Sequence, residues 1–289
     1  MVTILNVVFD GLMVGGIYAL IAVGLSLQYG VAKVLNVSHG EFIVVGAFIT
    51  WMLYTVFGIN PLLCLVIVGP VAFLIGFVLH RTMFRSLLNT SPSLDVFEGR
   101  SLLAAFGLLF VIQNIAIIAW GDQIASYSYL AFPVNLGGAV FAGNRLATLG
   151  FALGIGLIFY LFLTRTRLGK AIRAGAQDPA TAGLMGVNIN QVLALCFGLG
   201  ALMAGFAGVL ISMIYSVQAT MGLQYTLIAV IVVVLGGMGS IPGSFLGGII
   251  LGLVGSVATY IEPGLTMVSY YAIFTLLLLV RPAGIMGKK

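Results

Sequence analysis

Charged residues are scarce in this sequence, and their scarcity excludes a water-soluble fold. Only 7% of the 289 residues are charged and 61% are hydrophobic, whereas a soluble domain carries about 25% charged residues on its surface. No charged side chain occurs between Asp178 and Glu262, and none occurs between Glu41 and His80. About 20 apolar residues cross a bilayer as a helix. Each uncharged run is therefore long enough for more than one membrane span.

A polar and apolar alternation is also missing, which excludes a membrane β-barrel, because barrel strands alternate with period two. The segments 228–235 and 271–280 are apolar on every side. The sequence predicts an all-α polytopic membrane protein, with residues 1–289 forming a single transmembrane domain of eight or nine helices. The expected spans are 11–29, 42–57, 62–79, 101–120, 146–164, 191–215, 223–241, 244–261 and 264–280.

Cysteine and catalytic motifs are nearly absent. The two cysteines, Cys64 and Cys196, are far apart in apolar runs and predict neither a disulfide framework nor a metal site. We find no P-loop, nucleophile elbow or metal-spaced histidine cluster. We therefore expect no enzyme activity and no bound cofactor on this chain. The net charge of +5 comes from basic residues beside the spans, so it predicts membrane topology and no nucleic-acid partner.

The basic residues predict the orientation, because Lys and Arg gather on the cytoplasmic side of membrane proteins. They predict a cytoplasmic C-terminus and leave the side of the N-terminus open, since the segment 42–57 is short and is entered through a polar sequence. A broken or re-entrant helix is possible near 36–57. The three basic groups are Arg81, Arg85 and Arg100; Arg165, Arg167, Lys170 and Arg173; and Arg281, Lys288 and Lys289.

Polar side chains inside the spans are candidates for the translocation path, because such groups are costly in lipid. One group lies at the mouth of the second span, where the side chains either meet a solute or cap a broken helix. The other lies in mid-span, where amides either bond to a neighbouring helix or face a wet cavity. The candidates are Asn36, Ser38, His39 and Glu41, and Gln113 and Asn114.

The longest predicted cytoplasmic loop, 165–190, carries a second candidate site. Its pattern predicts two short helices over 168–177 and 179–185, with Asp178 as the N-cap of the second, Pro179 in its first turn and Gly186 as its stop. A short helix faced with small residues is suited to dock on another protein, although contact with lipid headgroups explains it equally well. The remaining candidates in this loop are Gly169, Arg173, Ala180, Ala182, Gly183 and Leu184.

These residues resemble the permeases of branched-chain amino acid (Liv-type) ATP-binding-cassette importers. The loop sequence RTRLGKAIRA at 165–174, followed by Gln177, Asp178 and 182–186, is similar to the family's coupling loop. Other similar motifs are GGIYALIAVGL at 15–25, LNVSHGEF at 35–42, Phe106-Gly-Leu with Gln113-Asn114, and GGMGSIPG at 236–243.

The resemblance implies a translocation subunit that docks its loop helix in a cleft of a separate ATPase. It implies two ATPase subunits that hold ATP and Mg²⁺, a second permease that is expected to be a paralogue, a periplasmic solute-binding protein, and a bacterial inner-membrane location. It also implies a gate or turn at Gly236, Gly237, Gly239, Pro242 and Gly243. A branched-chain amino acid or a related small solute is the expected cargo. The alternative is a self-sufficient secondary transporter or channel.

Overall fold

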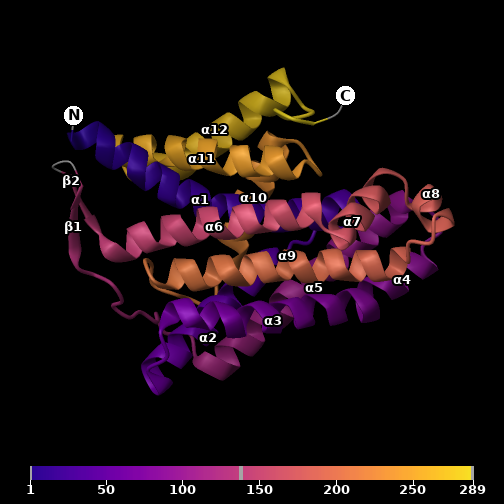
Figure 1. Ribbon diagram of the computed structural model, residues 1–289, viewed down its shortest axis with the longest axis horizontal. Helices are drawn as coiled ribbons and strands as arrows, with labels where there is room; N and C mark the ends of the chain where they lie inside the picture. The colour runs from indigo at the N-terminus through magenta and orange to yellow at the C-terminus, as the bar shows by residue number, and fades with distance from the viewer. Residues whose placement is uncertain (1, 137–138, 288–289) are drawn as a thin grey trace.

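The computed structural model describes residues 2–136 and 139–287 (Figure 1). Its long helices lie side by side and run along the longest axis of the molecule, and one short hairpin is attached at an end. The helices are α1 (Val2–Ala32), α2 (His39–Phe57), α3 (Pro61–Leu79), the π-helix η1 (His80–Phe84), α4 (Arg85–Thr90), α5 (Leu94–Trp120), α6 (Gly143–Arg165), α7 (Arg167–Gln177), α8 (Pro179–Leu184), α9 (Ile189–Ser212), α10 (Gly222–Gly236), α11 (Ile241–Ile261) and α12 (Leu265–Val280). The strands are β1 (Pro133–Leu136) and β2 (Ala139–Ala142), which pair antiparallel.

The prediction of an all-α polytopic membrane protein is confirmed. Among the described residues, seven helical segments are long and apolar enough to cross a membrane, and α10 and α12 are shorter apolar helices. Boundaries differ from the predicted ones where apolar sequence alone cannot mark a helix end. Helix α1 is longer than the predicted 11–29, and α10 stops at Gly236, before the turn-rich sequence that had been included in the predicted 223–241.

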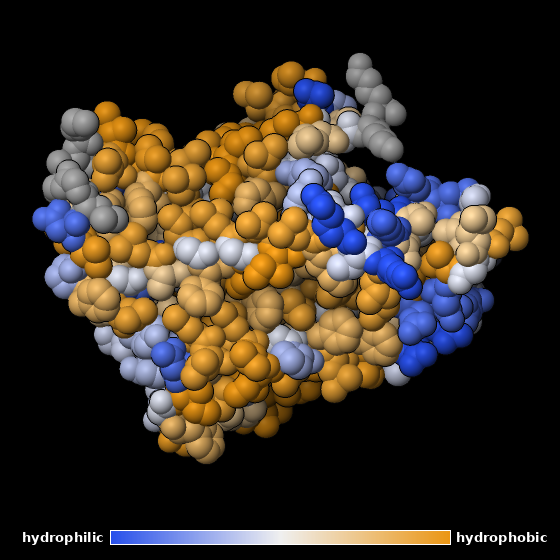
Figure 2. Space-filling view, in the orientation of Figure 1, coloured by the Kyte–Doolittle hydropathy of each residue, from blue (hydrophilic) through white to orange (hydrophobic). Residues whose placement is uncertain are grey.

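The two ends of the bundle differ in charge. The hairpin end holds β1 and β2, the start of α1 and the start of α6, while the opposite end holds α4, α7 and α8 (Figure 1). Hydrophilic residues gather at this opposite end, and apolar residues cover most of the visible surface between the two ends (Figure 2). We call it the basic end, after Arg81, Arg85, Arg165 and Arg173.

Helices α1 and α9 form the centre of the bundle, where α1 packs along α11 and α9 packs along α3. Small residues permit the close approach: a methyl group added to Gly15 would lie 2.9 Å from the Cα of Ile249 on α11. On the other side of the bundle, a methyl group added to Gly198 would lie 2.9 Å from the Phe73 ring on α3. Such close packing replaces the hydrophobic driving force that is missing between helices in lipid.

The first turns of α2 and α10 meet inside the bundle. The amide of Gly40 donates to the Thr226 hydroxyl at 2.8 Å, and the same hydroxyl lies 3.0 Å from the carbonyl oxygen of Val37. A side chain on Gly40 would overlap the Gly222 carbonyl. Two helix starts, far apart in sequence, therefore share one buried junction.

Candidate functional site

At the basic end, α8 is a short helix with a well-defined cap. The Asp178 carboxylate accepts hydrogen bonds from the amides of Ala180 at 3.0 Å and Thr181 at 3.1 Å, and it also bonds to the Thr181 hydroxyl. The Thr181 bonds hold the pKa of the Asp178 carboxyl below its ordinary value. Pro179 occupies the first turn, and Gly186 ends the segment with a φ of +86°. The predicted cap, first turn and stop of this helix are confirmed.

The outer surface of α8 has no partner among the described residues. Leu184 is 88% exposed and Met185 is 82% exposed, which is unusual for large apolar side chains at a polar end. Ala180 and Gly183 are also exposed, while Ala182 is buried on the inner side. The exposed face is therefore small at Ala180 and Gly183 and apolar at its tip.

Helix α7 links α8 to the bundle. Gly169 packs so closely on the last turn of α6 that any side chain would overlap the Leu163 carbonyl. The Arg173 guanidinium donates to the Thr164 carbonyl at 3.3 Å, which satisfies an unpaired group at the end of α6. These two predicted loop residues fasten α7, which leads directly into α8, to the end of the long helix α6.

A pair of adjoining cavities opens at the hairpin end. One, of about 580 Å³, has a mixed lining, and its polar members are Asn6, Asp10, Arg145, Tyr215, Ser256, Thr259, Tyr260, Thr266 and Tyr270. The other, of about 400 Å³, is also mixed: the apolar residues Ile17, Ile211, Met221, Ile228 and Met267 line it together with the polar residues Ser216, Gln218 and Gln224. They share the walls Val14, Tyr18, Tyr215, Thr266 and Tyr270. The two cavities therefore adjoin, and each presents both polar and apolar side chains.

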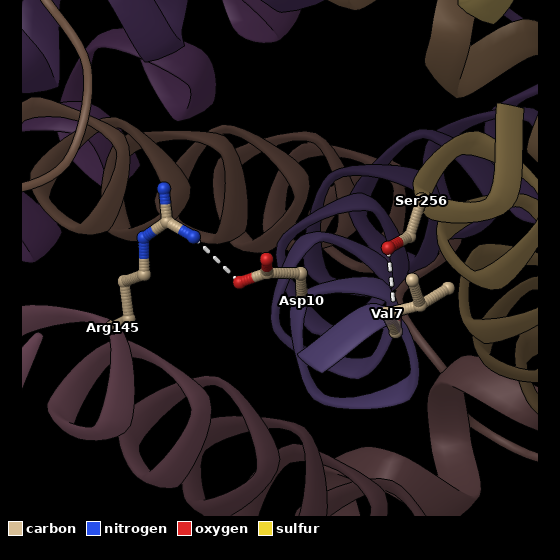
Figure 3. Close-up of polar contacts among 4 residues, drawn as sticks. All are labelled: Val7, Asp10, Arg145 and Ser256. Atoms are coloured by element: carbon tan, nitrogen blue, oxygen red, sulfur yellow. Dashed lines mark hydrogen bonds and ion pairs between the residues drawn. The ribbon is translucent and has the colours of Figure 1, made fainter. Parts of the chain in front are cut away.

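An ion pair lies in the larger cavity. An Arg145 Nη nitrogen, at the start of α6, is 2.6 Å from a carboxylate oxygen of Asp10 on α1, and both side chains are more than one third exposed (Figure 3). Beside it, the Ser256 hydroxyl of α11 donates to the Val7 carbonyl at 2.7 Å. Burial raises the pKa of the Tyr215 hydroxyl in the loop that follows α9.

Comparison with known proteins identifies the family. The family described as branched-chain amino acid transport system / permease component matches residues 7–281. The chain belongs to this family. The high-affinity branched-chain amino acid transport system permease protein LivH of Escherichia coli strain K12 is 31% identical over 98% of this permease and 96% of LivH. BraD of Pseudomonas aeruginosa, with the same description, is 30% identical over 96% and 94%.

A solved structure supports the fold of the permease. The structure titled PsaBC from Streptococcus pneumoniae in complex with Fab has a TM-score of 0.51 and 14% identity. The match covers 95% of this permease and 91% of that chain. At this identity the similarity concerns the arrangement of helices alone.

The structure buries the four path candidates near the start of α2. Asn36, Ser38 and His39 are 0% exposed, and Glu41 is 1% exposed. The Asn36 amide donates to Gln28 at 3.2 Å, and the Ser38 hydroxyl donates to Asn36 at 2.6 Å. The His39 Nε2 lies 3.1 Å from the Ile21 carbonyl. Asn36 and His39 thus connect this segment to α1, whereas Glu41 Oε2 and His39 Nδ1 are buried without a hydrogen-bond partner among the described residues. None of the four residues lines either of the two cavities.

The other predicted site residues lie apart from these. Asn114 is exposed on α5, and its amide donates to the Phe110 carbonyl one turn earlier at 2.8 Å, while Gln113 is partly buried. In the turn between α10 and α11, Gly237 and Gly239 have φ angles of +101° and +82°. Pro242 lies in the first turn of α11, and the backbones of Gly236 and Gly243 touch. This turn packs against the C-terminal segment, since the Met286 amide donates to the Gly236 carbonyl at 3.0 Å.

The cavity residues Asp10 and Arg145 were missed by sequence reasoning. Asp10 falls just before the predicted span 11–29, and Arg145 just before 146–164, so both counted as flanking residues. One feature of the sequence could have found them, because Arg145 is a basic residue in a region that the positive-inside rule predicts to be extracytoplasmic.

Proposed function

We propose that this chain is the transmembrane permease subunit of an ATP-driven importer for branched-chain amino acids or a related small polar or organic solute. Family membership supports this function, and the exposed, capped helix α8 is the observation that carries it. A permease that receives its energy from another subunit needs a rigid surface on which that subunit can act. In this proposal the whole chain is one transmembrane unit, and the loop 165–190 is its coupling element.

The coupling surface comprises α7 and α8. Ala180, Gly183 and Leu184 contact a cleft of an ATPase, while Gly169 and Arg173 transmit its movement to α6. Asp178, Pro179, Ala182 and Gly186 keep the helix formed. ATP and Mg²⁺ bind the two ATPase subunits, so this chain supplies movement and a path. The described residues contain no group of three or more His, Cys, Asp and Glu that could hold a metal ion.

The solute enters at the hairpin end, where the two cavities are open. A periplasmic binding protein delivers it there, and a second permease, a paralogue, completes the path between the two subunits. This orientation places the basic end and the C-terminus in the cytoplasm and the protein in the bacterial inner membrane, in accord with the positive-inside rule. The path leads from the cavities along α10 to the turn at 236–243, where Gly236, Gly237, Gly239, Pro242 and Gly243 act as a gate.

Co-expression with candidate ATPase, permease and binding-protein genes tests the coupling role. We expect the chain to co-purify with an ATPase and Gly183→Arg to abolish that association. A Cβ added at Gly183 would meet one described atom within 4 Å, the Ile189 Cγ1 at 3.9 Å, and the residue is exposed, so the chain itself should stay folded.

Gly99→Arg is the matched control, because a Cβ at Gly99 meets nothing within 4 Å and this exposed residue lies at the basic end of α5, outside the coupling surface. Its co-purification should equal that of the unmodified chain. Retention of the ATPase by Gly183→Arg would contradict docking through α8. A chain that purifies alone and moves solute in proteoliposomes without ATP would establish the secondary transporter instead.

A further inference from the structure

Arg145 stands apart from the other basic residues of the protein. Lys33, Arg81, Arg85, Arg100, Arg165, Arg167, Lys170, Arg173 and Arg281 all follow helix ends or adjoin helices at the basic end. Arg145 is the one described Lys or Arg at the hairpin end, where it lines an open cavity. An arginine placed against the general charge distribution requires a specific partner, and Asp10 supplies only part of it.

The Asp10 and Arg145 pair is only partly satisfied. A single Arg145 nitrogen and a single Asp10 oxygen form the contact, at 2.6 Å. The other guanidinium N–H groups and the second carboxylate oxygen remain for a ligand in the cavity. Arginine binds carboxylates through two parallel hydrogen bonds, and a carboxylate binds an ammonium group equally directly. The pair therefore offers adjacent sites for one negative and one positive group.

The neighbouring cavity matches the rest of such a ligand. Beside the shared residues Tyr18 and Tyr270, the second cavity presents Ile17, Ile228 and Met267. Its polar residues Ser216, Gln218 and Gln224 are separate members of the same lining. These side chains provide an apolar surface for an aliphatic chain, and a binding site of this kind fixes orientation with a few polar groups. A monocarboxylate or an amine would leave one member of the charged pair without a ligand group.

We infer that Asp10 and Arg145 form a binding site for a zwitterionic α-amino acid with an apolar side chain. Arg145 binds the α-carboxylate, Asp10 binds the α-ammonium group, and the side chain lies toward Ile17, Ile228 and Met267. This inference rests on the proposed function and sharpens it. It selects apolar amino acids over the other small polar or organic solutes that the proposed function allows. The alternative role for the pair is only to tie α1 to α6.

Exchanging the charges of Asp10 and Arg145 distinguishes solute binding from a purely structural tie between α1 and α6. The complete complex is reconstituted with its ATPases, partner permease and binding protein, and uptake of labelled L-leucine is measured. Arg145→Gln should lower uptake roughly tenfold, the loss expected for one charged hydrogen-bonding group. The double variant Asp10→Arg with Arg145→Asp restores an ion pair but reverses the site, so uptake should stay equally low while the complex assembles normally. Uptake at the unmodified rate in the exchanged variant would overturn the site.

Asp122→Asn is the matched control, since Asp122 is an exposed carboxylate in the segment between α5 and the hairpin and lines neither cavity. Its uptake should equal that of the unmodified complex, and a loss equal to that of Arg145→Gln would overturn the assignment. ATP-dependent uptake by the unmodified complex is measured first. Its absence would refute the proposed function, whereas a refuted binding site would leave that uptake intact.

Thermal unfolding of the purified complex without binding protein provides a second measurement. L-leucine should raise the melting temperature of the unmodified complex and leave that of Arg145→Gln unchanged. The single-charge analogues 4-methylpentanoate and 3-methylbutylamine should each raise it less than L-leucine does. Equal shifts with L-leucine and 4-methylpentanoate would show that the ammonium group is not recognised and would overturn the inference.

Discussion

Two polar regions of this permease differ in what their side chains face. At the junction of α1 and α2, Gln28, Asn36 and Ser38 are fully buried and bonded to one another or to backbone. At the hairpin end, Asp10 and Arg145 are more than one third exposed and line a cavity. Both regions are costly in lipid, but of the two only the second lines the cavities described above.

The comparison teaches that depth within a span is a poor guide to contact with solute. An amide in mid-membrane is satisfied most simply by a neighbouring helix, and Gln28 follows this rule by donating to the Phe197 carbonyl on α9 at 3.1 Å. Residues near the ends of the helices, such as Asp10 and Arg145, can instead line a cavity that is open to the outside of the molecule. We therefore expect the polar cluster between α1 and α2 to stabilise the fold and the hairpin end to select the solute.

The largest effect is expected beside this cluster, where the starts of α2 and α10 touch. Gly40→Leu would force a side chain into the Gly222 carbonyl and separate the starts of α2 and α10. Backbone overlap of this kind should cost at least about 3 kcal/mol of stability. The yield of monodisperse protein in detergent measures it, with Gly107→Leu, in open space on α5, as the control. Normal yield of Gly40→Leu would show that the two helix starts are not packed together.

A smaller loss is expected from Asn36→Ala. It removes the bonds to Gln28 and Ser38 and leaves a buried acceptor or donor unpaired, which should cost about 1–3 kcal/mol. Thermal unfolding should register this loss, while uptake per assembled complex stays unchanged. The opposite pattern, unchanged stability with lost uptake, would place Asn36 on the translocation path, as the sequence suggested.

Asp178 extends the comparison to the basic end, where a fully exposed polar group has a structural role. Asp178→Ala removes the cap of α8 and should reduce the stimulation of ATPase activity by loaded binding protein several-fold, because an uncapped short helix frays. Asp178→Asn keeps an acceptor oxygen at the cap and should retain most of the stimulation. Equal losses in both variants would assign the effect to charge and not to capping.

The smallest effect is expected at Asn114. Its amide is satisfied by the Phe110 carbonyl of its own helix, and its side chain is exposed on α5. Asn114→Leu should therefore leave both uptake and thermal stability near those of the unmodified complex. A marked loss of uptake would reveal that this face of α5 meets the solute or the second permease.

Much of the fold could be predicted from the sequence, because uncharged apolar runs and turn residues mark membrane helices directly. The cap at Asp178 and the stop at Gly186 could be predicted as well, because they depend on local backbone preferences. The length of α1 was not predicted, because the helix continues from the predicted span back through the polar residues Asp10 and Asn6, where hydropathy gives no signal for a helix.

The candidate site was harder to predict because cavities arise from tertiary packing. Tyr18 and Tyr270 are 252 positions apart, yet their hydroxyls lie 3.4 Å from each other where the two cavities adjoin. Asp10 and Arg145 are joined by a contact across 135 positions. Neither pairing leaves a periodic pattern in the sequence, whereas the buried Asn36 and His39 stood out because they interrupt an apolar run.

Uptake by the complete reconstituted complex tests the central claim most directly. Proteoliposomes that contain this chain, its partner permease and the two ATPases receive labelled L-leucine with its binding protein, with ATP supplied on the ATPase side. The account predicts accumulation that requires both ATP and binding protein and that Gly183→Arg abolishes. Accumulation that is independent of ATP and unaffected by Gly183→Arg would contradict it.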